Sequence, residues 1–386
     1  MSLVDLALSS TQQAFQEEIR TWLAENVPKE TFAPPSTAEG LEQHRKWERR
    51  LFEGGFAAVH WPTAFGGRSL GPIETSIFYD EYLAAGAPAR LNRLALGLAG
   101  PTLIECGTPD QQERWLENML SCDEIWCQGF SEPDAGSDLA SLRTKGIIDG
   151  DVMRITGQKI WTSHSRFADW IFALVRTDFD APKHKGITFV MIDRHSPGVE
   201  VKPIQQMNYA ADFAEVFFAD VEVPLTNVIG DINDGWRIAM VTLTHERSSN
   251  LNTAAHFHAL LDEIVAMVPD SLRRDPRVQA DIGRFYEEIE AYRYMTLRTM
   301  SELSSGRRPG PQSGMGKLWW TGMQTRIHEF GLSLLGNRAE VLADDNKVSP
   351  LIQQYWLGRA AHIYAGSSEI QRNIIAERSL GLPKGS

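Results

Sequence analysis

The sequence predicts an α+β fold in which two helical regions flank a β-rich middle region. Apolar residues recur at helical spacing before about residue 122 and again after Gly235. Between these regions, short β-type runs alternate with turn dipeptides such as Asp149-Gly150 and Pro197-Gly198. We therefore expect three domains, an N-terminal α-helical domain at 1–122, a middle β-domain at 123–232 and a C-terminal helical domain at 233–386.

The N-terminal region contains five expected helices. The first begins with an expected N-cap at Thr11 and continues with apolar residues at helical spacing. The last is opened by Pro109, a residue favoured in the first helical turn. The later four are expected at residues 41–52, 73–85, 95–106 and 109–120.

The middle and C-terminal regions differ in the period of their apolar residues. Short runs rich in β-branched and aromatic residues predict strands at 125–130, 152–156, 170–176, 187–193 and 215–223. The helical period then predicts long helices at 236–251, 255–267, 279–303, 313–335 and 351–361. A last helix is expected from near Ser368 to a point before Gly381.

Composition and charge exclude several classes of protein. The chain has 386 residues, 42% of them hydrophobic, which is enough for more than one core. A net charge of −12 without a basic run argues against nucleic-acid binding. No segment approaches the roughly 20 apolar residues of a membrane span, and the N-terminus lacks the basic start of a signal peptide. We expect a soluble, cytoplasmic protein without nucleic-acid or membrane partners.

The three cysteines carry no recognisable metal-binding pattern. Cys106, Cys122 and Cys127 lack metal-ligand spacing, and an odd number fits free thiols in a reducing compartment. We expect Cys122 and Cys127 to be small core residues.

Four segments carry motifs that have chemical content when they are taken together. Residues 129–138 read GFSEPDAGSD, 157–163 read GQKIWTS, 220–224 read DVEVP, and 364–375 read YAGSSEIQRNII. Alone, each fits an ordinary loop, strand or helix cap. In this order and spacing they resemble the acyl-CoA dehydrogenase family, over essentially the whole chain. The resemblance implies a middle β-barrel or sheet domain and a C-terminal four-helix bundle.

The resemblance implies FAD as the cofactor. Phe130 and Ser131 match positions whose backbone and hydroxyl contact the flavin ring. Trp161 matches the aromatic residue that lies against this ring, and a flat apolar face suits a flat ring. Ser163 matches the hydroxyl near flavin N5, where a hydroxyl can both donate and accept. The alternative interpretation of Trp161 is a core tryptophan, which would be preferred without Ser163 close by.

Further cofactor contacts are implied in the middle region and near the C-terminus. Gln128 stands where the family frequently has an aromatic residue. Ser367 and Glu369 match positions that contact FAD, at the start of the last helix. Ser368 with Gln371 fits a capping box, so a plain helix cap is the alternative interpretation of this segment.

The reaction of the family needs a carboxylate base, donors to the thioester carbonyl and flavin N5 as the hydride acceptor. In many members the base follows the tyrosine of the Tyr-x-Gly-Ser motif, but here that residue is Ala365. Glu246-Arg247 matches the placement in isovaleryl- and long-chain-like enzymes, so Glu246 is the expected base and His245 its rival. Ala365 keeps a backbone N–H, which binds the thioester oxygen in the family.

Several residues are expected along the substrate channel. The resemblance suggests Ser137, Arg247 and Tyr364 as contacts of acyl-CoA. Arg90 and Arg93 lie in the region that closes the pocket in relatives. We interpret both arginines as solvated, with contact to a polar acyl end as the alternative.

The resemblance also implies protein partners. An electron-transferring flavoprotein is the expected electron acceptor, and a homotetramer is the expected assembly. Segments 272–284 and 335–338 depart from the family pattern for contacts with FAD across subunits. A heterotetramer with a related subunit, or a non-catalytic partner subunit, therefore stays open as an alternative.

Overall fold

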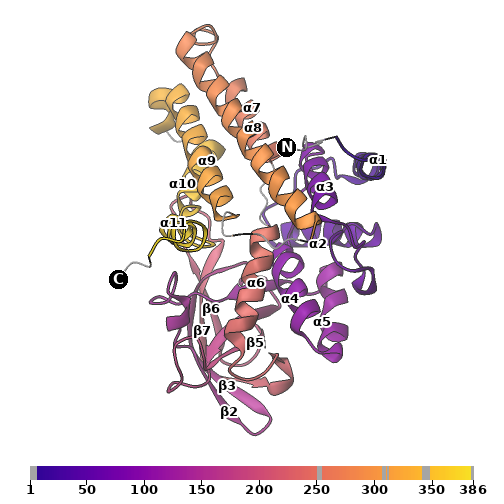
Figure 1. The fold of residues 1–386 in the computed structure, drawn as a ribbon, viewed down its shortest axis with the longest axis vertical. Coiled ribbons are helices and arrows are strands. Elements are labelled where there is room, and N and C mark those ends of the chain that lie inside the picture. The colour runs from indigo at the N-terminus through magenta and orange to yellow at the C-terminus, as the bar shows by residue number, and fades with distance from the viewer. Residues whose placement is uncertain (1–6, 250–253, 307–309, 311–312, 341–347, 384–386) are drawn as a thin grey trace. The chain divides into compact units, whose positions relative to one another are not determined.

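The computed structural model describes residues 7–249, 254–306, 310, 313–340 and 348–383, without the side chains of 246–249 and 313. The chain forms two compact units, both drawn in Figure 1. The sheet unit consists of Lys29–Ser69 and Pro88–Asn250, and the helical unit of Met1–Pro28, Leu70–Ala87 and Leu251–Ser386. The three sequence domains with boundaries near 123 and 233 stay a prediction.

The sheet unit is built on eight strands among its described residues. Their order is β6-β7-β3-β2-β4-β5-β8, and β1 pairs in parallel with β4. The strands are β1 (Trp126–Gly129), β2 (Lys145–Asp149), β3 (Val152–Ser163), β4 (Trp170–Arg176), β5 (Ile187–Asp193), β6 (Val199–Ile204), β7 (Phe213–Pro224) and β8 (Val228–Ile229).

The strands expected from the sequence are present, and β2, β6 and β8 were missed. The ranges expected for β4 and β5 are confirmed, because both strands are buried along almost their whole length and read as continuous apolar runs. β3 continues to Ser163, beyond the expected end at 156. β2 and β6 are largely exposed and β8 is very short, so none of them gives a strong apolar pattern.

Two apolar cores lie within the sheet unit. One contains Trp61, Leu103 and Phe172, and it joins strands to residues of α4 (Gly100–Cys106), α5 (Pro109–Ser121) and α6 (Gly235–Ser249). The helix α2 (Ala38–Glu53) packs near α5. The other core takes alternate residues of the strands, among them Cys127. Burial of Cys122 and Cys127 confirms their prediction as small core residues.

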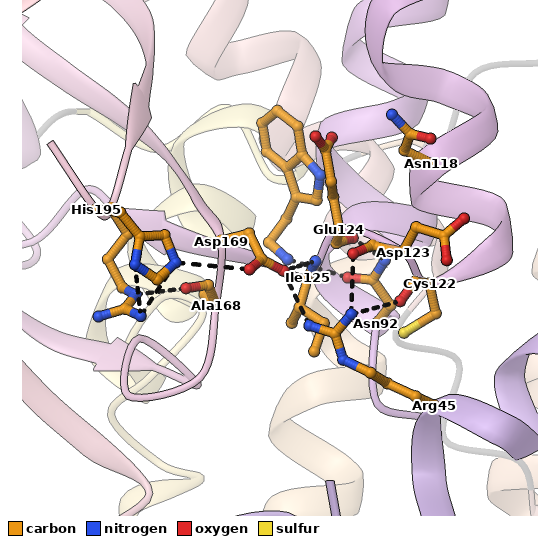
Figure 2. Close-up of polar contacts among 12 residues, drawn as sticks. Arg45, Asn92, Asn118, Cys122, Asp123, Glu124, Ile125, Ala168, Asp169 and His195 are labelled. Atoms are coloured by element: carbon orange, nitrogen blue, oxygen red, sulfur yellow. Dashed lines mark hydrogen bonds and ion pairs between the residues drawn. The ribbon is translucent and has the colours of Figure 1, made fainter. Parts of the chain in front are cut away.

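A polar network joins the helices of the sheet unit to its strands (Figure 2). The Arg45 guanidinium donates to Asp169 Oδ2 at 3.1 Å and to the Asp123 carbonyl at 2.9 Å. Asp169 Oδ2 also accepts from Ile125 N at 2.8 Å. Asn92 donates to the Glu124 carbonyl at 2.9 Å. These bonds satisfy backbone groups where the chain passes from α5 into β1.

The helical unit packs long helices around a core that contains Phe257, Ile289 and Met323. Figure 1 shows α8 and α9 running beside each other. The helices are α1 (Ser10–Asn26), α3 (Pro72–Ala84), α7 (Ala254–Ala266), α8 (Pro276–Ser304), α9 (Ser313–Leu335), α10 (Pro350–Ala360) and α11 (Ser368–Ile374). No helix in the described part of the chain is long and apolar enough to cross a membrane.

Two helix starts differ from the sequence prediction. The N-cap of α1 is Ser9 and not Thr11, because Ser9 and Gln12 exchange side-chain and backbone bonds in a capping box. The N-cap of α11 is Ser367, whose hydroxyl accepts from the backbone N–H of Ile370. Ser368 therefore lies inside the helix, and the expected capping box of Ser368 with Gln371 is wrong.

Candidate functional site

A strained tryptophan marks the end of β3. The register of β3 against β7 shifts between Lys159 and Thr162, and Trp161 adopts a φ of +60°. This left-handed backbone is uncommon for a bulky residue and costs free energy. The Trp161 side chain is 56% exposed, and its ring meets that of Phe213 edge-on at 6.1 Å between centroids. Strained backbone of this kind is concentrated at functional sites, so we take this end of β3 as a candidate binding surface.

The loop after β1 lies against this end of β3. The carbonyl of Ser131 accepts from the backbone N–H of Ile160 at 2.9 Å, directly before Trp161. Ser163 is the last residue of β3 and pairs with Phe213 of β7. The structure thus places Ser131, Trp161 and Ser163 at one junction of loop and strand.

A buried ion pair, which the sequence did not predict, lies beneath this junction. Lys159 is fully buried, and its Nζ donates to Glu132 Oε1 at 2.7 Å and to the Phe130 carbonyl at 3.2 Å. The Glu132 carboxylate also accepts from the backbone N–H groups of Arg143, at 2.6 Å, and Thr144, at 2.9 Å. In the sequence, Lys159 falls in a strand whose other buried residues are Met153, Ile155 and Thr162.

Burial and pairing shift the pKa values of this ion pair. Burial lowers the pKa of Lys159 to about 8, although the carboxylate of Glu132 opposes the shift. Burial acts to raise the pKa of Glu132, but the charge and hydrogen bonds of its partners outweigh it and leave the pKa below its ordinary value. The pair is therefore held in its charged form at neutral pH.

Phe130 and Gln128 have different surroundings. The Phe130 ring is buried and meets Phe172 and Phe189 edge-on, at 5.8 and 5.9 Å between centroids. Its side chain therefore belongs to the core, and its backbone is the part that lies at the loop. Gln128 is half-buried in β1 and pairs with Phe172 of β4. Ser137 is exposed, farther along the same loop.

The expected base lies on α6. Glu246 and Arg247 fall within α6, but their side chains lie outside what the structure describes. The neighbouring His245 is described, and its Nε2 lies 3.3 Å from Glu105 Oε2 of α4. Burial lowers the pKa of His245, although Glu105 opposes the shift. Successive positions on a helix are separated by about 100°, so position 246 is not on the face that meets Glu105.

In the helical unit, a tight turn carries Tyr364 and Ala365. Ala365 has a φ of +53° and Gly366 a φ of +86°. Lys317 of α9 donates to the Tyr364 carbonyl, and its ammonium lies 5.1 Å from the centroid of the Tyr364 ring. Gln371 Nε2 approaches the Ala365 carbonyl at 3.5 Å. The Gln371 side chain thus contacts this turn and does not form the expected capping box with Ser368. Two carbonyls of the turn are thus held by side chains of α9 and α11.

The start of α11 carries the remaining residues that are expected to contact FAD. Ser367 is the N-cap and Glu369 lies exposed in the first turn. Hydrogen bonds from its own backbone N–H and from Ser367 lower the pKa of Glu369. Ser368 is buried, and its hydroxyl lies 3.4 Å from Nδ1 of His362. Ser367 and Glu369 therefore lie at the start of α11, directly after the turn that contains Ala365.

The interpretation of Arg90 as solvated is wrong. Its side chain is 8% exposed and pairs with Glu48, which is 1% exposed, at 2.8 Å. The same guanidinium donates to the Ala57 carbonyl at 2.8 Å. Glu48 also accepts from Leu91 N at 2.6 Å. Arg93 is exposed, as expected.

Comparison with known proteins gives the family. Models of the acyl-CoA dehydrogenase N-terminal, middle and C-terminal domains match residues 9–123, 127–221 and 233–380. The chain is 38% identical over 380 residues to acyl-CoA dehydrogenase IpdE1 of Mycobacterium tuberculosis, covering 96% of this chain and 98% of that protein. The chain belongs to the acyl-CoA dehydrogenase family.

Two solved structures have the same fold as this chain. A chain of the "Tcur3481-Tcur3483 steroid ACAD" matches with a TM-score of 0.88 and 28% identity, covering 99% of this chain and 100% of that chain. A chain of the ChsE4-ChsE5 complex from Mycobacterium tuberculosis matches with a TM-score of 0.84 and 26% identity, covering 99% and 100%. The predicted fold of helical, sheet and helical parts is confirmed.

Membership in the acyl-CoA dehydrogenase family confirms the predictions of an oxidoreductase and of FAD as its cofactor. Two residues of the sheet unit, Trp161 and Thr162, have properties that suit the binding of FAD. Trp161 offers an exposed aromatic face, and the buried Thr162 Oγ1 has no hydrogen-bond partner among the described residues. An orphaned polar atom is costly unless a ligand or water satisfies it.

The acyl-CoA dehydrogenase should lose stability in acid through His164, the residue after Ser163. Burial, helped by Arg93, lowers the pKa of His164 to about 4. The unfolded chain binds this proton below a pKa of about 6.5, so the stabilisation is complete above pH 6.5 and is lost as pH falls towards 4. The loss should reach about 3 kcal/mol.

The urea midpoint of unfolding, measured between pH 7 and pH 4, checks this expectation. His164→Asn should flatten the pH dependence, because Asn does not titrate and tolerates the left-handed φ of +65° at this position. His60, whose pKa burial also lowers to about 4, supplies a second test through His60→Gln. Equal slopes in all three proteins would contradict the assignment.

Proposed function

We propose that the protein converts an acyl-CoA thioester to a trans-2-enoyl-CoA, with Glu246 as the base. The observation that carries this proposal is a sequence feature: Ala365 stands in the Tyr-x-Gly-Ser motif, and Glu246-Arg247 is present on α6. Ala365 has no acidic group, so the α-proton needs a base elsewhere. The contact of His245 with Glu105 favours Glu246 over His245 for this role.

Two groups of the turn support polarisation of the thioester. The N–H of Ala365 makes no hydrogen bond with another described residue, and it is the proposed donor to the thioester oxygen. The carbonyl of Tyr364 shares a planar trans peptide with this N–H and points the opposite way. Lys317 binds that carbonyl and thereby fixes the direction of the Ala365 N–H. A fixed donor is most effective as negative charge develops on the oxygen.

The remaining roles in the proposal concern binding. We assign contacts with FAD to Gln128, Phe130, Ser131, Trp161, Ser163, Ser367 and Glu369, and contacts with acyl-CoA to Ser137, Arg247 and Tyr364. FAD, when bound, supplies the acceptor for the hydride that leaves the β-carbon. The exposed ring of Trp161 and the half-exposed ring of Tyr364 support binding roles for both residues.

For the substrate we propose an acyl-CoA with a bulky, steroid-linked acyl group. The support is the similarity of the whole chain to the Tcur3481-Tcur3483 steroid acyl-CoA dehydrogenase. An assembly of two different chains is also supported, because Tcur3481-Tcur3483 and ChsE4-ChsE5 are each a pair of chains. We propose a tetramer, either of this chain alone or of this chain with a related subunit. From the family resemblance, we also propose an electron-transferring flavoprotein as the electron acceptor.

One experiment tests the function and the assembly. The purified chain is denatured to release and measure FAD, its mass is measured by light scattering, and its flavin is titrated anaerobically with straight, branched and steroid-linked acyl-CoA. We expect about one FAD per active site and the fastest reduction with the steroid-linked thioester. A yellow protein that no acyl-CoA reduces would refute dehydrogenation. A colourless chain that gains FAD with a sister subunit would establish the paired assembly.

A further inference from the structure

We infer that Lys159 is a positioning residue for the flavin, because it orients the backbone N–H of Ser131. The inference rests on the proposed contact of Ser131 with FAD. Its evidence is the position of Lys159 Nζ, 3.2 Å from the Phe130 carbonyl and 2.7 Å from Glu132 Oε1. The lysine thus binds the loop on both sides of Ser131.

Peptide geometry links the lysine to the Ser131 amide. The Phe130 carbonyl and the Ser131 N–H belong to one planar trans peptide, so they point in opposite directions. Lys159 is fully buried and holds the carbonyl from the interior, which directs the N–H of Ser131 away from the lysine. This N–H forms no hydrogen bond with another described residue.

The next peptide is fixed as well. The Ser131 carbonyl accepts from Ile160 N at 2.9 Å. The next residue, Glu132, is held by Lys159 through its carboxylate. Both peptides that flank Ser131 are therefore bound to β3, through Lys159 and Ile160. Because these two donors stand directly before Trp161, one short stretch of strand sets the relative placement of the Ser131 amide and the tryptophan ring.

The ion pair gives this arrangement its rigidity. Glu132 accepts from Lys159 and from the N–H groups of Arg143 and Thr144, so the carboxylate is bound on several sides. Hydrogen bonds to charged groups are about twice as strong as neutral ones. A neutral side chain at 159 would keep its apolar packing but release the Phe130 carbonyl, and the loop could then rotate this peptide.

Lys159→Met tests the inference, since Met retains an unbranched stem without the ammonium. Apoprotein is reconstituted with FAD, and binding is followed by flavin fluorescence. We expect the Kd for FAD to rise about 10- to 100-fold, in line with the loss of a charged hydrogen bond. At saturating FAD the visible circular dichroism of the bound flavin should also change, because the N–H contact is lost.

Lys202→Met is the matched control. Lys202 lies on β6 of the same sheet and pairs with Glu200 at 3.3 Å, but its side chain is 54% exposed. This variant should bind FAD with the Kd and dichroism of the parent. Equal losses in both variants would overturn the inference, and so would an unchanged Kd and spectrum in Lys159→Met. Failure of the parent to bind FAD would instead refute the cofactor assignment.

A second variant covers misfolding of Lys159→Met, which far-UV circular dichroism would reveal. In Lys159→Met combined with Glu132→Gln, neither buried residue carries a charge, so the cost of an unpaired carboxylate disappears. The bond from Lys159 to the Phe130 carbonyl is still absent. A folded double variant with weakened FAD binding and altered dichroism supports the inference, and one with parental binding and dichroism overturns it.

Discussion

Glu246→Gln should abolish flavin reduction by acyl-CoA while the protein still binds FAD and acyl-CoA. Gln has nearly the shape of Glu but no basic oxygen, so the α-proton has no acceptor. General-base catalysis typically contributes about 10²- to 10⁴-fold, and we expect the upper end because the α-carbon is a weak acid. Stopped-flow absorbance of the flavin under anaerobic conditions measures the rate of reduction.

His245→Gln is the matched control, one residue away on α6. Its imidazole lies against Glu105, so its loss should leave flavin reduction within a few-fold of the parent rate. An inactive His245→Gln with an active Glu246→Gln would place the base one residue earlier. If both variants reduce flavin like the parent, neither residue is the base and the proposed mechanism is wrong.

A rescue variant adds a positive test of the same assignment. In many members of the family the base is the residue after the tyrosine of the Tyr-x-Gly-Ser motif. Here that residue is Ala365, which already adopts a φ of +53°. A glutamate there would inherit the backbone conformation that Ala365 has, without a new strain of its own. Glu246→Gln combined with Ala365→Glu should recover part of the lost rate. Recovery would show that the α-carbon can be reached from either position.

The sequence predicted features that depend on local patterns. β4 and β5 were predicted correctly because each is a continuous apolar run, and α5 because Pro109 opens it. The family resemblance supplied the cofactor and the site motifs. Ser131, Trp161 and Ser163 do meet at one junction, although their contacts with FAD stay a prediction.

Interactions between distant residues could not be predicted in this way. Lys159 and Glu132 stand 27 positions apart and meet only after β3 pairs with its neighbours. Likewise, β3 was expected to end early because Gly157 and the polar residues after it interrupt its apolar pattern. A charged residue in a sequence is usually solvated, so its burial becomes visible only when the structure supplies the partner.

Arg90 shows this limit most clearly, and Arg90→Met should destabilise the protein by about 3–5 kcal/mol. The sequence suggested a solvated side chain, but the guanidinium bonds Glu48 through Nε at 3.1 and 2.9 Å to the two carboxylate oxygens. Removing it leaves the Glu48 carboxylate buried without its counter-ion. Arg114→Met is the control, because Arg114 is 49% exposed and exposed pairs contribute about 0–1 kcal/mol.

Urea unfolding of the apoprotein, followed by far-UV circular dichroism, measures these losses, and a third variant identifies their cause. Arg90→Met combined with Glu48→Leu removes both charges, so stability should recover in part. Recovery should be incomplete, because Leu91 N loses the acceptor that it has in Glu48 at 2.6 Å. If Arg90→Met instead keeps parental stability and raises only KM for acyl-CoA, then Arg90 serves the acyl end of the substrate and the structural role assigned to its pair with Glu48 is wrong.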